Sequence, residues 1–147
     1  MNFNSQICTT REQSERLLAL GLKKETADMM FIFLVKDFRG KDVPDDEKVY
    51  SLCTWYKETS MRVGLEKRVY IPAWSLHRLI EMMPTVIPHE DYHLILGITA
   101  TCVYYADDEY AETFKDFEGD LYDCVVKCIE WLIKEGYFNK EYLEEKK

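Results

Sequence analysis

Hydrophobic residues recur at helical spacing near the start of the chain, and the flanking residues are typical of helix ends. Three leucines supply the apolar face, namely Leu17, Leu18 and Leu20. Thr9 with Glu12 three residues later has the form of a capping box, and Gly21 suits a left-handed C-terminal position. We therefore predict a helix that starts after Thr9, followed by a second short helix over residues 25–29.

Two more helices are predicted from the same periodicity. Pro72 fits the first turn of a middle helix and Pro84 follows its end. The apolar face of this helix is Leu76, Leu79, Ile80 and Met83. The last helix is expected to begin at the cap Asp120, run to about Glu135 and end at Gly136. Its apolar stripe is Leu121, Val125, Cys128 and Leu132.

The segments between these helices are rich in strand-forming residues. The run MFIFLV at residues 30–35 is continuously apolar, so it is either a buried strand or a continuation of the preceding helix. Strands are expected at residues 49–58, 68–71, 92–98, 101–105 and 110–117. We predict a single α+β domain over residues 1–147, with an antiparallel sheet or meander packed against the N-terminal, middle and C-terminal helices.

Composition and charge narrow the class of protein. A chain of 147 residues has the size of one domain, and a formal net charge of −8 argues against general nucleic-acid binding. The stretch 107–123 has eight acidic residues and only one basic residue, Lys115. It predicts a solvated acidic surface, or else a docking face for a basic partner or a mimic of a nucleic-acid backbone.

Targeting signals and disulfides are not expected. The N-terminus does not resemble a signal peptide, and no apolar run approaches the roughly 20 residues of a membrane span. The five cysteines are an odd number without clustered spacing, which does not indicate a disulfide framework. We expect a cytoplasmic protein without a membrane partner and with no cofactor.

The string His89-Glu90-Asp91-Tyr92-His93 matches the H-E-x-x-H pattern of zinc hydrolases. On a helix this spacing would place His89 and His93 one turn apart on a zinc ion, with Glu90 as general base and Glu112 as a third ligand. Pro88 directly before the motif and a strand-like segment directly after it argue against such a helix. The competing interpretation is a loop that leads into a strand.

The strongest binding candidates are aromatic and basic residues in the middle of the chain. They are Trp55, Tyr56, Arg62, Lys67, Arg68 and Arg78. Aromatic faces could hold a nucleotide base while the basic groups hold its phosphates. The leading hypothesis is a non-catalytic binding protein that sequesters a small ligand, a nucleotide signal among the options, or occupies a host protein. The alternatives are the zinc-dependent hydrolase and a structural subunit that forms homo-oligomers.

Three stretches together carry a resemblance to a known family. They are residues 7–29 (ICTTREQSERLLALGLKKETADM), 71–84 (IPAWSLHRLIEMMP) and 120–143 (DLYDCVVKCIEWLIKEGYFNKEYL). In this order they resemble a family of small uncharacterised proteins from gut bacteria, their phages and integrating elements. The family has no assigned activity, cofactor or catalytic residue. The resemblance therefore implies only a context, namely a bacterial or phage cytoplasm and a mobile-element accessory gene.

Overall fold

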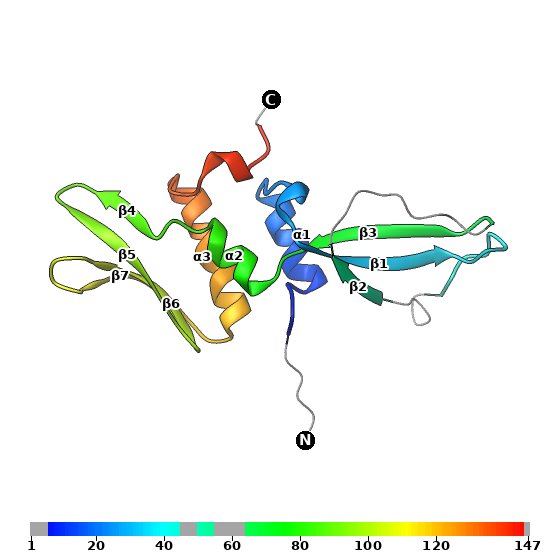
Figure 1. Cartoon of the computed structure of the whole chain (residues 1–147), viewed down its shortest axis with the longest axis horizontal. Coiled ribbons are helices and arrows are strands. Elements are labelled where there is room, and N and C mark those ends of the chain that lie inside the picture. The colour runs from blue at the N-terminus through cyan, green and yellow to red at the C-terminus, as the bar shows by residue number, and fades with distance from the viewer. Residues whose placement is uncertain (1–5, 45–49, 55–63, 146–147) are drawn as a thin grey trace, which may run out of the picture.

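The computed structural model describes residues 6–44, 50–54 and 64–145. Its helices lie together in the middle of an elongated molecule, with one sheet on either side (Figure 1). The helices are α1 (Arg11–Ala19), α2 (Leu76–Met82) and α3 (Leu121–Glu135), with 3-10 turns at Lys24–Thr26 and Lys140–Tyr142. The predicted α+β class is confirmed, as are helices at the start, middle and end of the chain.

The strands form two antiparallel sheets rather than the one sheet that we expected. The first sheet has the order β2-β1-β3, built from β1 (Met29–Lys36), β2 (Tyr50–Thr54) and β3 (Lys67–Ala73). The second has the order β4-β5-β6-β7, built from β4 (Val86–His89), β5 (Tyr92–Thr99), β6 (Cys102–Asp107) and β7 (Thr113–Glu118). The meander predicted over residues 92–117 is therefore confirmed, and β4 extends it by one strand.

The ambiguous run at residues 30–35 is a strand. It forms most of β1, which is the central strand of its sheet and pairs with both β2 and β3. The short helix predicted over residues 25–29 is wrong, because a 3-10 turn ends at Thr26 and β1 begins at Met29. Of the strand predicted over residues 49–58, the described part is β2.

The first helix is capped one residue later than predicted. The Thr10 hydroxyl accepts a hydrogen bond from the Gln13 backbone N–H, and the Gln13 side chain accepts one from the Thr10 N–H. This is a capping box, but Thr10 and Gln13 take the places that we predicted for Thr9 and Glu12. Thr9 is fully buried instead, where its hydroxyl accepts a hydrogen bond from the Trp74 N–H at 3.1 Å.

Pro72 and Pro88 both lie in edge strands, and Pro72 is therefore not in the helix start that we predicted for it. Pro72 is not in the first turn of α2 but in β3, opposite Met30, and α2 begins after the cap Ser75. Because β3 is an edge strand, a residue without an N–H is tolerated there. Pro88 is likewise in an edge strand, β4, which explains why the sequence of β4 did not indicate a strand.

The hydrophobic core lies between the helices and the inner face of the β4–β7 sheet. Its fully buried members come from every layer, namely Leu17, Leu79, Leu94, Val103, Tyr105, Val125, Ile129 and Leu132. The Tyr105 hydroxyl donates a hydrogen bond to the Pro84 carbonyl at 2.7 Å, so this buried polar group is satisfied. Cys124 and Cys128 are buried in the same core, as small apolar side chains.

The first sheet is attached to the helices through one of its ends. Along β3 the side chains change from partly exposed at residues 67–70 to buried at Ile71, Pro72 and Ala73, next to the helices. The following residue, Trp74, is fully buried and donates from its indole N–H to the Thr26 hydroxyl at 2.9 Å. The segment around Trp74 is therefore the junction between the two halves of the molecule.

The outer face of the second sheet carries one unusually close contact. Gly97 and Tyr104 are opposite each other on β5 and β6. A Cβ atom built on Gly97 would lie 2.2 Å from Cζ of the Tyr104 ring. The tyrosine ring therefore covers the glycine backbone directly.

Candidate functional site

The residues predicted to bind a ligand are not brought together by the part of the fold that the structure describes. Trp55, Tyr56 and Arg62 lie outside the described residues. Lys67 and Arg68 begin β3, at the end of that strand away from the helices, whereas Arg78 is on α2 (Figure 1). These groups therefore belong to different parts of the molecule.

Arg68 and Arg78 both have carboxylate partners within the fold. The Arg68 guanidinium lies 3.0 Å from a Glu66 carboxylate oxygen, and the Arg78 guanidinium lies 3.1 Å from Glu81. Arg78 also donates to the Thr26 carbonyl at 2.8 Å. Arg78 thus ties α2 to the segment before β1, a role that needs no ligand.

The H-E-x-x-H string forms a β-hairpin and not a helix. It leads into a strand, as the competing interpretation expected, but His89 belongs to strand β4 rather than to a loop. His89 ends β4, Tyr92 begins β5, and these two residues are opposite each other. The His89 ring lies 5.0 Å from the rings of both Tyr92 and Phe114 on the inner side of the sheet, while His93 is one position further along β5 and so faces the other side. His93 Nδ1 lies 3.7 Å from Asp108. The two histidines therefore cannot meet on one zinc ion in this arrangement.

A different set of potential metal ligands meets on the second sheet. Cys102, Asp116 and Glu118 each offer a ligand atom, and these atoms lie within 4.8 Å of one another. Cys102 is opposite Glu118 in the β6–β7 pair. Both carboxylates are exposed, and this group contains none of the residues of the predicted zinc motif.

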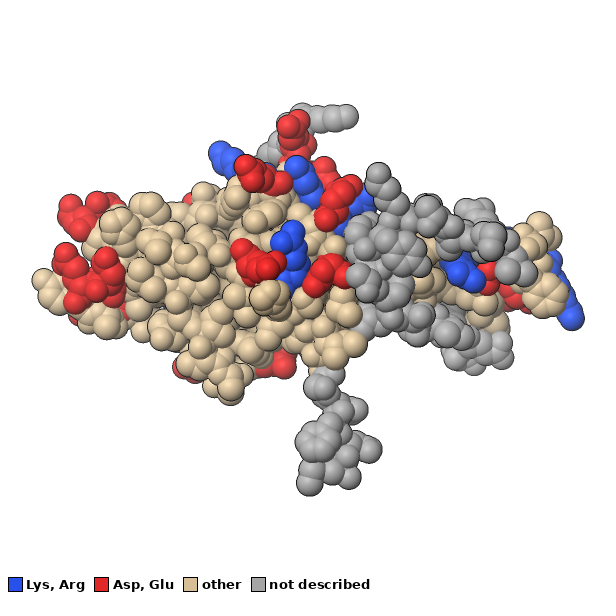
Figure 2. Space-filling view, viewed as in Figure 1, with Lys and Arg blue, Asp and Glu red and all other residues tan. Residues whose placement is uncertain are grey.

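The free end of the second sheet is strongly acidic. The β4–β5 turn, the end of β6 and the loop between β6 and β7 carry the acidic residues Glu90, Asp91, Asp107, Asp108, Glu109 and Glu112. We call these residues, together with Tyr110, the acidic tip. Figure 2 shows the red acidic side chains gathered at that end of the molecule. Tyr110 is 77% exposed, the largest exposed fraction among the exposed large apolar side chains of the described residues.

The acidic tip has a defined backbone conformation. The Asp107 N–H donates to the Glu112 carbonyl at 2.9 Å, and the Ala111 N–H donates to the Asp107 carbonyl at 3.0 Å. The Asp107 carboxylate accepts a hydrogen bond from the Glu109 N–H at 2.7 Å. Ala111 has a φ of 56°, in the left-handed region that turns the chain sharply. The loop therefore presents Tyr110 from a closed turn.

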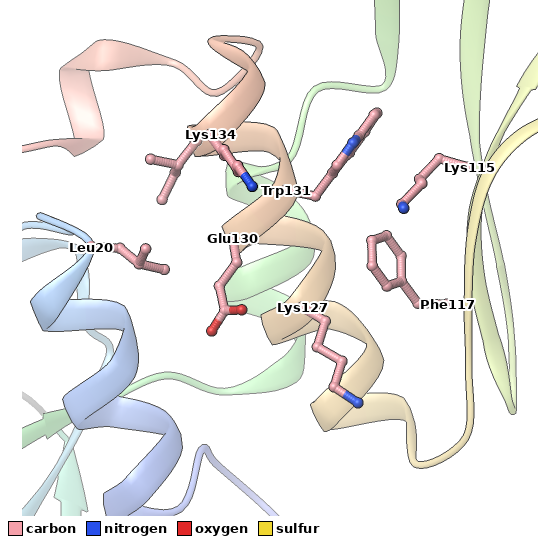
Figure 3. A pocket seen from close by; sticks show the side chains of 8 residues that line it. Leu20, Lys115, Phe117, Lys127, Glu130, Trp131 and Lys134 are labelled. Carbon is pink, nitrogen blue, oxygen red and sulfur yellow. The ribbon is translucent and has the colours of Figure 1, made fainter.

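A trough of about 590 Å³ lies over the outward side of α3. Its lining is Leu20, Lys115, Phe117, Lys127, Glu130, Trp131, Ile133 and Lys134. The α3 side chains form the floor, Leu20 at the end of α1 forms one wall, and Lys115 and Phe117 of β7 form the other (Figure 3). Three lysines and two aromatic rings thus face one surface of a chain whose net charge is −8.

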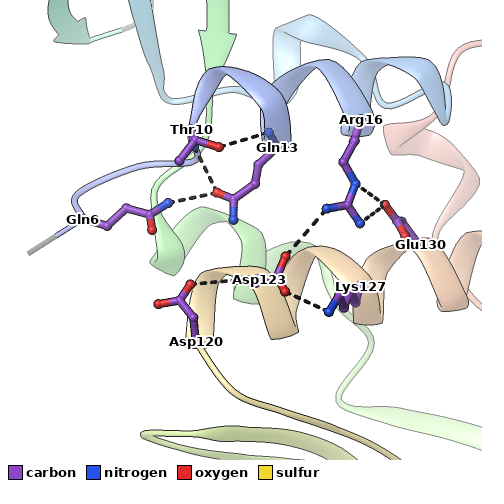
Figure 4. Close-up of polar contacts among 8 residues, drawn as sticks. All are labelled: Gln6, Thr10, Gln13, Arg16, Asp120, Asp123, Lys127 and Glu130. Atoms are coloured by element: carbon purple, nitrogen blue, oxygen red, sulfur yellow. Dashed lines mark hydrogen bonds and ion pairs between the residues drawn. The ribbon is translucent and has the colours of Figure 1, made fainter.

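Only some of the charged side chains in the trough have an ion-pair partner among the described residues. Glu130 is held by Arg16 at 2.6 Å, and Lys127 is held by Asp123 at 2.9 Å (Figure 4). Lys134 has no ion pair or hydrogen bond with any residue that the structure describes. Lys115 lies over the Phe117 ring, 5.5 Å from its centroid, and has no carboxylate partner in the described part of the chain. Two positive charges are therefore available to an anionic partner.

The aromatic residues around Trp131 are packed against one another. The Trp131 ring lies 5.8 Å from Tyr105, 6.3 Å from Phe114 and 5.7 Å from Tyr137, in tilted arrangements. Such contacts hold the indole in place, so it offers a rigid apolar surface between the cationic groups.

A second cavity, of about 670 Å³, adjoins the trough. Leu20 and Ile133 line both cavities, so the two lie side by side, and we call them together the groove. The further lining of the second cavity is Ala19, Gly21, Gly136, Phe138, Lys140, Leu143, Glu144 and Glu145. Apolar side chains from the ends of α1 and α3 and from the C-terminal segment meet here. The groove thus has a cationic, aromatic part and a second part whose apolar side chains are bordered by the charged residues Lys140, Glu144 and Glu145.

Comparisons of the chain with protein-family models, with curated proteins and with solved structures find no match. Among the described residues, no helix has the length and apolar character that crossing a membrane requires.

The sequence-based search for binding residues missed this groove. Its lysines and its apolar residues come from β7, α3 and the C-terminal segment, and α1 with the residues directly after it adds further apolar contacts. One signal was present in the sequence, because Lys127 and Lys134 are seven residues apart and so fall on the same side of a helix.

Proposed function

We propose that this chain is a non-catalytic binding protein and that its groove holds an acidic protein segment bearing one apolar anchor residue. The observation that carries the proposal is the pair of lysines without carboxylate partners, Lys115 and Lys134, on either side of Trp131. Carboxylates of the bound segment would pair with these lysines, and the anchor would enter the adjoining apolar cavity.

The shape of the groove favours a protein segment over a small molecule. Small ligands are usually enclosed over most of their surface. Here one helix forms the floor, and the two walls come from α1 and β7, so the trough is open along its length (Figure 3). An extended or helical segment can lie in such a trough and still reach the second cavity.

The proposal is tested by titrating the protein with synthetic peptides that contain several glutamates and one leucine or tyrosine. Isothermal titration calorimetry should detect binding that weakens as salt is added, because two of the contacts are ion pairs. The double variant Lys115→Glu/Lys134→Glu should lose this binding. The matched control is Lys41→Glu, a charge reversal at an exposed position near the far end of the first sheet. Equal binding by the double variant and the control would refute the proposal.

A nucleotide is the second candidate ligand for the same groove. An indole face beside lysine ammonium groups suits a base and its phosphates. Mononucleotides and cyclic nucleotides therefore belong in the same calorimetric series. Binding of a nucleotide that is abolished in Trp131→Ala, with no binding of acidic peptides, would favour this candidate. The phage or mobile-element context implied by the family resemblance is an expectation that accompanies either candidate.

A further inference from the structure

We infer that the segment which occupies the groove is the acidic tip of a second copy of this chain. This inference rests on the proposed function, because it names the partner of the same groove. It is carried by the chemical match between the two surfaces. The lysines of the groove suit carboxylates that surround one apolar anchor residue, and the acidic tip presents Tyr110 among carboxylates.

The carboxylates nearest to Tyr110 are available for pairing. The side chains of Glu109 and Glu112 make no ion pair or hydrogen bond within the described residues. Asp107 and Asp108 are engaged in the turn and with His93, so they shape the tip. The two unpaired glutamates of one copy match the two unpaired lysines of the other in number and in charge.

Tyr110 supplies the anchor. A tyrosine that is 77% exposed leaves a large apolar surface in water, and its burial in a partner is favourable. The aromatic ring would pack against Phe138 and Leu143 in the second cavity, and its hydroxyl would lie toward the charged residues Lys140, Glu144 and Glu145 that border this cavity. Because the turn is already closed by its own hydrogen bonds, little conformational entropy is lost when it docks.

The position of the two surfaces allows the contact to be reciprocal. β7 leads from the acidic tip to the trough wall, with Glu112 at the tip and Lys115 and Phe117 in the wall. In the proposed dimer, two copies related by a twofold axis each place the tip in the groove of the other. Such an isologous contact closes on itself and yields a dimer.

The decisive experiment is a charge-swap complementation followed by analytical ultracentrifugation of the full chain. The unaltered protein should show a concentration-dependent monomer–dimer equilibrium. The groove variant Lys115→Glu/Lys134→Glu and the tip variant Glu109→Lys/Glu112→Lys should each be monomeric, because like charges then face each other. A mixture of the two variants should dimerise again, because every reversed charge meets its complement.

Controls separate a lost contact from a lost fold. The melting temperatures of both variants should match that of the unaltered chain, and Lys41→Glu and Glu25→Lys should leave the dimer intact. Tyr110→Ala should weaken dimerisation by roughly tenfold or more, as expected for a buried aromatic anchor. If either charge variant unfolds, the uncharged pair Lys134→Gln and Glu109→Gln provides the same comparison with a smaller effect.

The outcomes distinguish this inference from the proposed function. If the unaltered chain is monomeric at all concentrations but still binds the acidic peptides, the second-copy inference is overturned and the binding groove stands. If the chain dimerises and the mixture of variants fails to restore the dimer, the tip-in-groove contact is overturned. If neither peptides nor a second copy bind, the proposed function itself fails.

Discussion

The two sheets of this protein are buried in different ways. In the β4–β7 sheet, inward side chains alternate with outward ones, and Leu94, Val103 and Tyr105 are fully buried under α3. In β3 of the other sheet, burial instead increases along the strand toward the helices. One sheet is held through a face, and the other is attached through an end (Figure 1).

The comparison shows that an apolar strand sequence does not by itself determine how deeply the strand is buried. The apolar run of β1 would fit the inside of a large core, yet most of its side chains are only partly buried. The exceptions, Met30 and Phe33, are buried, and the Arg11 guanidinium lies 4.8 Å from the Phe33 ring centroid. The helices thus touch the first sheet near its attached end. Stability is therefore expected to be concentrated in the second sheet and the helices.

The largest effect is expected from Leu132→Ala. Leu132 is fully buried on α3, and removing its side chain leaves a cavity that should lower the free energy of unfolding by about 3 kcal/mol. Val69→Ala in β3 removes a side chain that is 38% exposed and should cost less than about 1 kcal/mol. Urea unfolding of both variants measures the contrast. Equal losses would show that the end-attached sheet is as essential to stability as the face-packed one.

Trp74→Phe tests the junction between the two halves. The replacement keeps most of the apolar volume but removes the indole N–H that donates to the buried Thr26 hydroxyl. Leaving that acceptor without its partner should cost about 2 kcal/mol. Thermal unfolding followed by circular dichroism gives the value. A biphasic transition in the variant, against a single one in the parent, would mean that Trp74 makes the two halves unfold together.

High pH should destabilise the core under the second sheet. Burial, with a smaller contribution from Cys124, raises the pKa of the Cys128 thiol from 9.0 to about 12. Below pH 9 the thiol is protonated in both states, so stability is unaffected. Above pH 9 the unfolded chain loses the proton first, and stability falls until about pH 12, by about 1.4 kcal/mol for each pH unit.

The control for this pH effect is Cys128→Ala, which removes the titrating group. Urea midpoints recorded between pH 8 and pH 10 should fall less steeply for the variant than for the parent, whatever the difference at neutral pH. Parallel pH profiles would assign the alkaline loss to other groups, for example to Tyr105, whose phenol pKa is also raised by burial.

A smaller effect than those at Leu132 and Trp74 is expected from Thr10 at the start of α1. Thr10→Ala removes the capping hydroxyl and should cost about 1 kcal/mol. Thr9→Ala should cost at least as much for a different reason, since Thr9 is buried and its hydroxyl is bonded to Ser14 and to the Trp74 backbone. Urea unfolding of the two variants compares them directly. A negligible effect at Thr10 would contradict the cap assignment.

Much of the fold could be predicted because its signals are local. The last helix was placed correctly from its cap Asp120 and its terminal Gly136, both of which act within one turn. The first cap was misplaced by one residue because Thr9 and Thr10 are equally suitable by type. Only the tertiary contact of Thr9 with Trp74 separates the two threonines. Pro72 was misread because a proline suits both a helix start and an edge strand.

Apart from the spacing of Lys127 and Lys134, the groove could not be predicted because its properties depend on residues that are far apart in the sequence. Lys115 and Lys134 matter because they lack carboxylate partners, and pairing is decided by the three-dimensional neighbours. The sequence singled out Arg68 and Arg78, whose charges turn out to be engaged with Glu66 and Glu81. A basic residue in a sequence shows a charge, but only the fold shows whether that charge is free.

The contact of Tyr104 with Gly97 has a consequence for how this protein can change over generations. Any side chain at position 97 would need the space that the tyrosine ring already fills, since even a Cβ would lie 2.2 Å from it. A larger residue at 97 therefore requires the Tyr104 ring either to move away from this position or to be replaced by a smaller side chain. Substitutions at the two positions should therefore be coupled, with a larger residue at 97 favoured where position 104 carries a smaller side chain.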